Sequence, residues 1–389
     1  MSHHMLQIFR DNTKHDSKSS LPTAIQNCIS MRVLTLILSI GFLFLLCSTI
    51  LCLGSSYFVL AQNASTIQNS THGVYIPTTI SKRAQEELKN LKPLPAMIKS
   101  PKPDDFAAWK KVDQQSDSEA LVKSQKIIDL YKPNITYKKI GGVNVVDIKP
   151  KNWSNNGKIL VYMHGGGYTQ LSANSTVGNA VLVSNATGLR VISIDYTLAP
   201  FSKWNHTTDQ VLSVIRDLKD KQGYPLHNVA FFGESAGGGL ALGSVLKMRD
   251  RGMAMPAAVV ALSPVTDLTL SGDTYFTLRD ADPILPDAES MKEWSSAYAK
   301  PSEQRIPYAS PVYGNFSKGF PPTLIEVGTK EVRLSDSVRL YQALDQSHIP
   351  VKLDVYEGMP HVFQFYLYDT PESKIALSKT NDFLKEYLK

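Results

Sequence analysis

Short apolar runs alternate with longer amphipathic segments from about residue 135 to the end of the chain, and this alternation predicts a mainly parallel sheet with crossover helices. The runs that we expect to form strands are residues 143–148, 158–163, 190–196, 229–235, 257–263, 323–328 and 351–357. Between them, residues 207–220 place Val211, Val214 and Leu218 on one helical face. Residues 335–346 and 373–388 show the same helical periodicity. The pattern therefore predicts an α/β fold.

Two further segments interrupt or precede this alternation. Residues 81–134 are helical and charged in pattern, with a proline-rich break at 92–103. Residues 270–320 lie between two predicted strands and contain no clear strand of their own. We expect both segments to form a helical cap over the sheet, which itself belongs to a domain of residues 135–389.

The amino-terminal part is strongly apolar. Residues 31–61 contain a single charge, Arg32, and are long enough to span a bilayer. The run ends in the small residue Ala61 before Gln62, as at a signal-peptide cleavage site. We therefore interpret residues 1–61 as a tail plus either a cleaved signal peptide or an uncleaved membrane anchor, with a buried core helix as a third alternative. Residues 62–80 are interpreted as a polar spacer.

Composition agrees with export. The three cysteines, Cys28, Cys47 and Cys52, lie in or before the apolar run, which excludes a disulfide framework, a cysteine nucleophile and a cysteine-ligated metal site in the rest of the chain. Asn-X-Ser/Thr sequons begin at eight of the seventeen asparagines, where chance would give roughly two. The net charge of +6 is modest and dispersed, so we expect no nucleic-acid partner. We expect a glycosylated, extracytoplasmic protein; the sequence specifies no oligomeric state.

The most informative motif is "GESAG", in which Gly233, Ser235 and Gly237 follow a predicted strand and precede a helix rich in Ala and Leu. A sharp turn at this position exposes a serine hydroxyl at the sheet edge, and small neighbours let strand and helix approach closely. The amino terminus of the helix also directs N–H groups at developing negative charge. We therefore predict that Ser235 is a nucleophile.

A serine nucleophile requires a base, and only His348 and His361 follow Ser235 in the chain. His348 precedes a strand and so lies at the opposite edge of a parallel sheet. His361 follows that strand, on the same edge as Ser235. We predict that His361 is the base.

The acid that orients this histidine is expected after the preceding strand, where two carboxylates compete. Glu331 lies where the strand ends, whereas Asp336 lies at a position typical of a helix cap. We favour Glu331, with Asp336 as the alternative.

The motif "HGGGY" follows another strand on the same edge. Backbone N–H groups of Gly165, Gly166 and Gly167, together with that of Ala236, are predicted to form an oxyanion hole. His164 precedes the serine and is interpreted as a loop-shaping hydrogen bonder.

Six ordered motifs, "HGGGY", "DYTLAP", "GESAG", "LSPVTDLT", "GTKEVRLSDS" and "GMPHVF", together resemble the hormone-sensitive-lipase family of α/β hydrolases over residues 135–389. The resemblance implies an α/β-hydrolase catalytic domain, a helical cap and hydrolysis of carboxylic esters. It matches the acid position to Glu331 and implies structural roles for Asp195, Asp267 and Glu234. Thr197 departs from the family's usual arginine.

The function expected from these residues and this resemblance is that of an exported serine carboxylesterase acting on small or medium acyl esters without a metal or organic cofactor. The alternatives are a lactonase or a deacetylase of acetylated sterols or sugars, a peptidase, and a non-catalytic ligand-binding protein on the same fold. Bulky apolar side chains of the cap could wall a pocket for the small-molecule ester; these are Phe106, Trp109, Tyr275, Phe276 and Trp294.

Overall fold

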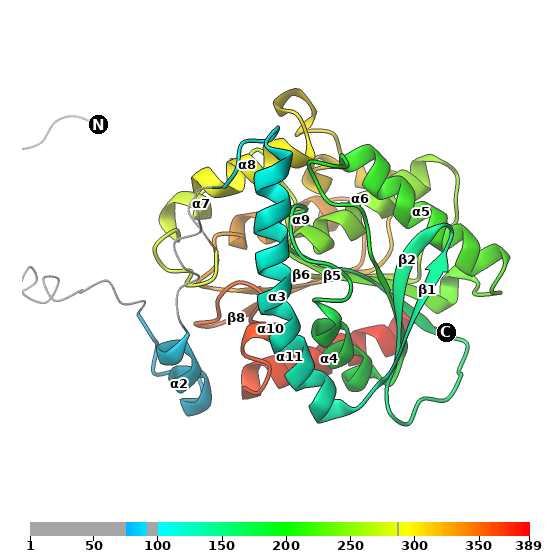
Figure 1. The fold of residues 1–389 in the computed structure, drawn as a ribbon, viewed down its shortest axis with the longest axis horizontal. Helices are drawn as coiled ribbons and strands as arrows, with labels where there is room; N and C mark the ends of the chain where they lie inside the picture. Colours follow the sequence, from blue (N-terminus) through cyan, green and yellow to red (C-terminus); the bar gives the residue numbers. More distant parts are fainter. Residues whose placement is uncertain (1–74, 92–99, 286–287) are drawn as a thin grey trace, which may run out of the picture. The chain divides into compact units, whose positions relative to one another are not determined.

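The computed structural model describes residues 75–91, 100–285 and 288–389. Its centre is an eight-stranded sheet in the order β1-β2-β4-β3-β5-β6-β7-β8 (Figure 1). The strands are β1 Asn134–Ile140, β2 Val143–Lys149, β3 Ile159–Met163, β4 Arg190–Ile194, β5 Val229–Glu234, β6 Ala258–Leu262, β7 Thr323–Gly328 and β8 Val351–Tyr356. Strands β3 to β8 pair in parallel, while β2 is antiparallel to both β1 and β4. The mainly parallel α/β sheet predicted from the sequence is confirmed.

Strand β1 was not predicted. It forms a hairpin with β2 across Gly141 and Gly142, both of which have positive φ. Only Ile140 of its seven residues is buried, so the strand lacks the apolar run that identified the others.

Helices cover both faces of the sheet. In Figure 1, α5, α6 and α9 lie above the strands and α4, α10 and α11 lie below them. Successive side chains of β3 therefore point to opposite faces of the sheet. Val161 packs in the core with α5, α6 and α9, and Tyr162 packs in the core with α4 and α11. The bounds of these helices are α4 Val177–Thr187, α5 Trp204–Asp220, α6 Ala236–Asp250, α9 Leu334–Asp345, α10 Phe363–Tyr366 and α11 Pro371–Tyr387.

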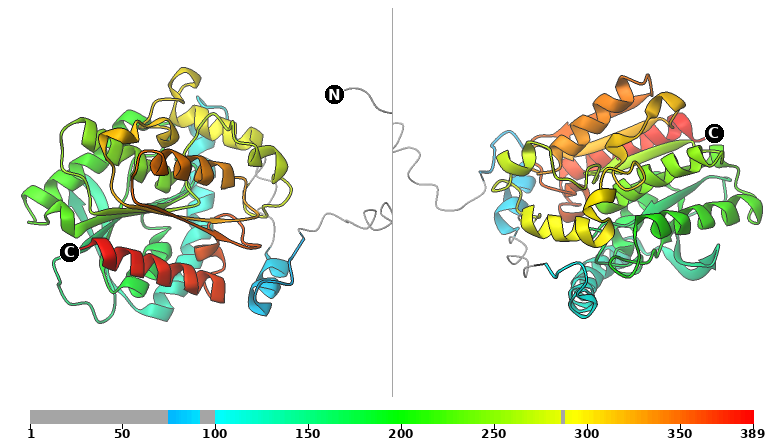
Figure 2. Two further views of the ribbon diagram at one scale, coloured as in Figure 1. Left: turned by 180° about the vertical axis from the view of Figure 1, so that it is seen from behind. Right: turned by 90° about the horizontal axis from the view of Figure 1, so that it is seen from above.

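Both segments expected to form the cap contain helices. Residues 81–134 contain α2 Lys82–Asn90 and the long α3 Phe106–Tyr131, which packs against α4. The described part of residues 270–320 contains no strand (Figure 2). It consists of α7 Thr274–Thr277, α8 Ala288–Tyr298 and the short 3₁₀ turns η2 Pro301–Glu303, η3 Pro311–Tyr313 and η4 Phe316–Lys318; a further turn, η1 Leu226–Asn228, precedes β5.

The expected signal peptide or anchor, residues 31–61, and the cleavage site at Ala61 lie outside the described residues, as does most of the spacer. Among the helices that are described, none combines the length and apolar character needed to cross a membrane.

Candidate active site

Ser235 occupies a strained turn between β5 and α6. Its backbone has φ 54° and ψ −122°, an unusual conformation for a residue with a side chain. The neighbouring glycines permit the close approach of strand and helix, because a Cβ on Gly237 would lie 2.0 Å from the carbonyl oxygen of Met163. The backbone N–H of Ser235 donates to the carbonyl oxygen of Leu262 at 2.9 Å, which ties the turn to the next strand. The serine is thus held at the sheet edge by backbone constraints alone.

His361 follows β8 and comes to the same edge. Its Nδ1 lies 2.9 Å from Oε2 of Glu331. Burial lowers the pKa of His361 to about 3, so the imidazole is neutral at neutral pH. A neutral ring that carries its proton on Nδ1, towards Glu331, leaves Nε2 as a proton acceptor.

Glu331 is fully buried and receives hydrogen bonds on both carboxylate oxygens. Oε1 accepts from the N–H of Gly328 at 2.5 Å and from the hydroxyl of Ser263 at 2.9 Å, and Oε2 faces His361. Ser263 in turn accepts the N–H of Val362 at 3.0 Å, which directs its hydroxyl proton to Glu331. Burial raises the pKa of Glu331, and the donors from Gly328 and Ser263 oppose that rise. The carboxylate is therefore surrounded by donors and suited to orient an imidazole.

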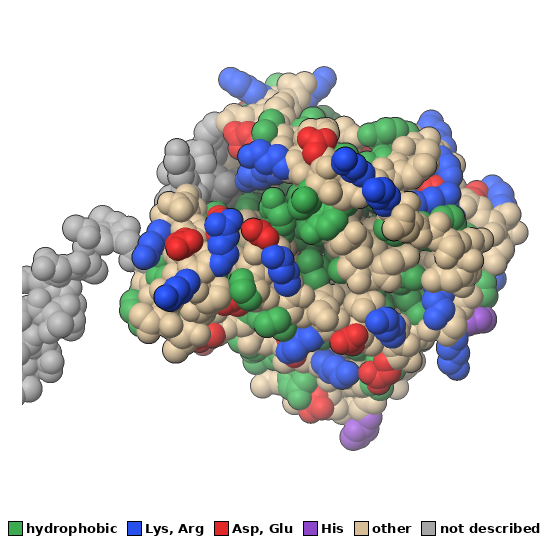
Figure 3. Space-filling view, turned by 90° about the horizontal axis from the view of Figure 1, so that it is seen from below, with side chains coloured by type: hydrophobic (Ala, Val, Ile, Leu, Met, Phe, Trp, Pro, Cys, Tyr) green, Lys and Arg blue, Asp and Glu red, His purple; other side chains and the backbone are tan. Residues whose placement is uncertain are grey.

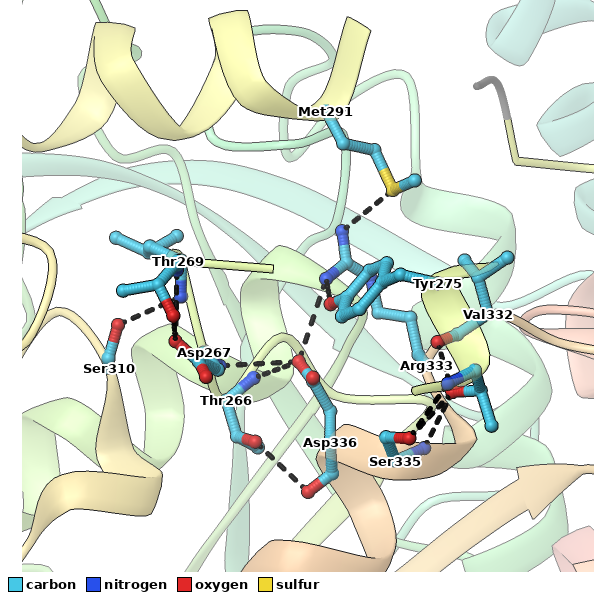
Figure 4. Close-up of polar contacts among 12 residues, drawn as sticks. Thr266, Asp267, Thr269, Tyr275, Met291, Ser310, Val332, Arg333, Ser335 and Asp336 are labelled. Carbon is cyan, nitrogen blue, oxygen red and sulfur yellow. Dashed lines mark hydrogen bonds and ion pairs between the residues drawn. The ribbon is translucent and has the colours of Figure 1, made fainter. Parts of the chain in front are cut away.

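Asp336, the alternative acid, lies in a different network (Figure 4). Its Oδ2 accepts the N–H groups of Thr266 at 2.8 Å and Asp267 at 3.2 Å, and lies 3.6 Å from the guanidinium of Arg333. The cap residue of α9 is Arg333, so Asp336 does not cap that helix as expected. It instead binds the first turn of α9 to the loop after β6.

The glycine loop is anchored by Glu234. The N–H of Gly165 donates to Oε1 of Glu234 at 2.8 Å, and the same oxygen accepts from Tyr162 and Asn179. Burial raises the pKa of Glu234 to about 7. The expectation that Gly165 donates to an oxyanion is therefore corrected, because its N–H is already used to hold the loop.

The remaining predicted donors are differently placed. Gly166 and Gly167 have φ of 97° and 62° and line the same cavity as Ser235, and the part of the chain that the structure describes offers no hydrogen-bond acceptor to either N–H. Ala236 is the first residue of α6, so its N–H has no acceptor within the helix. His164 is buried, stacks on Tyr196 and has its Nδ1 2.9 Å from the carbonyl oxygen of Gly165, as a loop-shaping residue would.

Ser235 and His361 line one cavity of about 550 Å³. No hydrogen bond between the Ser235 hydroxyl and His361 is found in the described part of the chain, a looseness that is common before substrate binds. The cavity also contacts residues of α2 and α3, and of the segment 361–369. Figure 3 shows a face on which hydrophobic side chains lie in a hollow bordered by charges of both signs.

Of the five aromatic residues expected to wall a pocket, only Trp294 lines this cavity. Phe106 and Phe276 are exposed, while Trp109 and Tyr275 are buried in packing contacts. Sequence reasoning missed Ser263, although its position directly after β6, at the same sheet edge, was a usable signal. Among the described residues, no group of His, Cys, Asp and Glu side chains is arranged to hold a metal ion.

Comparisons with known proteins find the α/β-hydrolase fold and several relatives named esterases or acetyl-hydrolases. A family model described as alpha/beta hydrolase fold matches residues 160–365. An acetyl-hydrolase of Streptomyces hygroscopicus is 34% identical over 229 residues, which cover 59% of this chain and 76% of that protein. An esterase of Acinetobacter venetianus is 28% identical over 63% of this chain and 80% of its own length.

Solved structures of an esterase and of a hormone-sensitive lipase share the fold of this chain. The crystal structure of esterase E25 superposes with a TM-score of 0.74 at 26% identity, covering 81% of this chain and 96% of that one. A hormone-sensitive lipase from a metagenome library superposes with a TM-score of 0.64 at 28% identity, covering 73% and 99% of the two chains.

Proposed function

Because this chain belongs to the hormone-sensitive-lipase family of α/β-hydrolase-fold esterases, we propose that it hydrolyses small and medium acyl esters through an acyl-enzyme on Ser235. The observation that carries this proposal is the convergence of a strained serine, a buried histidine and a buried glutamate at one sheet edge. The serine supplies the nucleophile, His361 the base and Glu331 the acid.

The proposed reaction has two steps. The Ser235 hydroxyl adds to the ester carbonyl carbon while its proton passes to Nε2 of His361, and the N–H groups of Gly166, Gly167 and Ala236 stabilise the oxyanion. Collapse of the intermediate breaks the bond to the alcohol, which leaves with the proton from His361. Water then adds to the acyl-enzyme by the same proton transfers and releases the acid. Throughout, Glu331 holds the imidazole and stabilises its charged form.

Serine replacement tests this proposal. We expect Ser235→Ala to lose nearly all ester hydrolysis and to keep its fold, because the turn is held by backbone hydrogen bonds of Ser235 to Leu262 and Val265. Ser244→Ala is the matched control, since Ser244 is a buried serine on helix α6, which follows Ser235. A folded Ser235→Ala protein with full activity would overturn the assignment.

A deacetylase is the second candidate, and the observation that favours it is the similarity to an acetyl-hydrolase. The same residues serve both reactions, so the two differ only in the ester that is cleaved. Comparing acetate, butyrate and octanoate esters of one alcohol separates them: a deacetylase acts on acetate alone.

We also propose that the protein acts outside the cytoplasm, either secreted or anchored through residues 31–61. The apolar run and the excess of sequons support this. All six sequon asparagines among the described residues are exposed: Asn134, Asn152, Asn174, Asn185, Asn205 and Asn315. Protease added to intact cells should reach an anchored form, or the medium should contain a cleaved one. Full-length protein protected inside intact cells would contradict this placement.

A further inference from the structure

A buried carboxylate, close in the chain to two residues that line the catalytic cavity, has no part in the mechanism described so far. Asp282 lies in the loop between α7 and α8 and is only 7% exposed. Its Oδ1 accepts the N–H groups of Ile284 at 2.9 Å and Leu285 at 3.4 Å, which closes a tight turn. Its Oδ2 is buried and has no hydrogen-bond partner among the residues that the structure describes. Asparagine would close such a turn equally well, so the turn does not account for the buried charge.

The surroundings of Asp282 connect it to the reaction. Ile284 and Leu285, which it holds, line the cavity together with Ser235 and His361. The charge of Asp282 favours the protonated form of His361. The same charge interacts with Glu331.

Two further groups bear on this electrostatic environment. The guanidinium of Arg333, in the loop before α9, opposes protonation of His361. The phenol of Tyr366, on α10, interacts with both Asp282 and Glu234. Asp282 therefore favours the protonated form of His361, and Arg333 disfavours it. Glu331 has a different role, because it is hydrogen-bonded to the imidazole ring.

We propose that Asp282 is a positioning residue of this hydrolase, which fixes the Ile284–Leu285 wall of the cavity and stabilises the imidazolium that His361 becomes during catalysis. The proposal rests on the proposed function of His361 as the base. Its physical reason is that burial disfavours a charged imidazole, so that an additional nearby negative charge lowers the barrier to proton transfer from Ser235.

A charge on the buried Asp282 side chain lowers the stability of the folded protein. Burial raises the pKa of Asp282 to about 6. In the unfolded chain an aspartate titrates at about 3.9, so the stability associated with this group is greatest below that pH and is lost as pH rises to about 6. Above pH 6 the carboxylate is charged and can support His361; below it, the carboxyl is neutral and resembles an amide.

Two substitutions separate the roles of the two oxygens. Asp282→Asn keeps an acceptor for Ile284 and Leu285 but removes the charge, whereas Asp282→Ala removes both. Asp280→Asn is the matched control, because Asp280 lies on the same loop with its side chain 91% exposed. The turnover of a short-chain ester and the melting temperature are measured for each protein between pH 5 and pH 8.

For Asp282→Asn we expect kcat to fall about tenfold at pH 8, the effect of one pKa unit of imidazolium stabilisation. The ratio of wild-type to variant kcat should approach one at pH 5, where the wild-type carboxyl is protonated. The melting temperature of Asp282→Asn should exceed that of the wild type at pH 8. Asp282→Ala should in addition change the acyl preference, and Asp280→Asn should change none of these quantities.

Two results would overturn the inference. One is a kcat ratio that stays constant from pH 5 to pH 8 with a lowered melting temperature, as a purely structural turn residue would give. The other is full activity of Asp282→Asn at every pH. Either result leaves the proposed function standing as long as Ser235→Ala is inactive; an active Ser235→Ala protein would instead refute the proposed function itself.

Discussion

Nδ1 of His361 lies 2.9 Å from Oε2 of Glu331, and both side chains are buried. The other oxygen of Glu331 is occupied by two donors from different loops, the N–H of Gly328 and the hydroxyl of Ser263. The glutamate is thus fixed at one end and presents a single oxygen to the imidazole. This arrangement specifies the orientation of His361 before any substrate binds.

Replacing Glu331 by glutamine tests this relationship. We expect Glu331→Gln to lower kcat by about 10³-fold or more, because an amide cannot accept hydrogen bonds at both ends and the proton on His361 would move to the wrong nitrogen. KM should change little. Steady-state kinetics on a short-chain ester give both constants.

Asp336→Asn provides the contrast to this substitution. Asp336 pairs with the buried guanidinium of Arg333, and removing its charge leaves that cation uncompensated. We expect a loss of several kcal/mol in unfolding free energy, about 3–5 for a buried pair that is broken, with kcat changed only a few-fold. A large loss of kcat for Asp336→Asn and a small one for Glu331→Gln would assign the acid to Asp336 instead.

The glycine loop is expected to be intolerant of any side chain at Gly166. A Cβ there would lie 2.2 Å from the carbonyl oxygen of Gln170, and its φ of 97° is unfavourable for other residues. Gly166→Ala should therefore displace the oxyanion donors and lower kcat by about 10²-fold. The control is Gly188→Ala, where φ is also positive but no atom lies within 4 Å, so that only about 1 kcal/mol of stability should be lost. Equal kcat for both variants would exclude an oxyanion role for this loop.

The cavity should limit acyl length. Each added methylene gains about 0.8 kcal/mol only while there is room to bury it. We expect kcat/KM to peak for acyl chains of about two to eight carbons, as the family resemblance implies, and to fall for long-chain triglycerides. A series of p-nitrophenyl esters measures this. Activity that rises to sixteen carbons, or that jumps at an oil–water interface, would favour a true lipase.

Trp294 is the aromatic residue expected to set this limit. It lines the cavity and lies against Gly167, where an added Cβ would be 2.8 Å from its ring. Trp294→Ala should shift the preferred acyl chain to greater length. Phe276→Ala should not, because Phe276 is 70% exposed and does not line the cavity.

Glu326 gives a pH dependence of stability that is separate from the reaction. It is buried on β7, accepts hydrogen bonds from Gln364 and Thr380, and burial raises its pKa to about 8. An unfolded glutamate titrates at about 4.3, so the stability associated with this group is lost as pH rises from about 4 through 8.

Glu326→Gln removes this titration. Its free energy of unfolding, measured by urea denaturation, should depend less steeply on pH between 5 and 8 than that of the wild type, with kcat unchanged. Parallel pH dependences for the two proteins would show that Glu326 is ionised in the folded state.

The sequence predicted those elements whose burial produces a regular pattern. The central parallel strands β3, β4, β5 and β6 are covered on both faces and so read as apolar runs, and α5 shows a helical apolar stripe. Helix α4 has buried residues around its whole circumference and β1 has almost none, so neither produces a recognisable period. Both were missed for that reason.

The positions of Ser235, Glu331 and His361 at one sheet edge followed from chain order and strand polarity. The hydrogen bond that occupies the N–H of Gly165, and the one from Ser263 to Glu331, could not be predicted, because they join side chains and backbone groups far apart in the sequence. Nor does composition reveal which aromatic residues face the cavity.

Covalent labelling with a fluorophosphonate, followed by digestion and mass spectrometry, tests most directly whether Ser235 is the nucleophile. We expect a single phosphonyl adduct on Ser235, loss of ester hydrolysis in proportion to labelling, and no adduct in the Ser235→Ala protein. Labelling of a different serine, or full hydrolytic activity after stoichiometric labelling of Ser235, would contradict it.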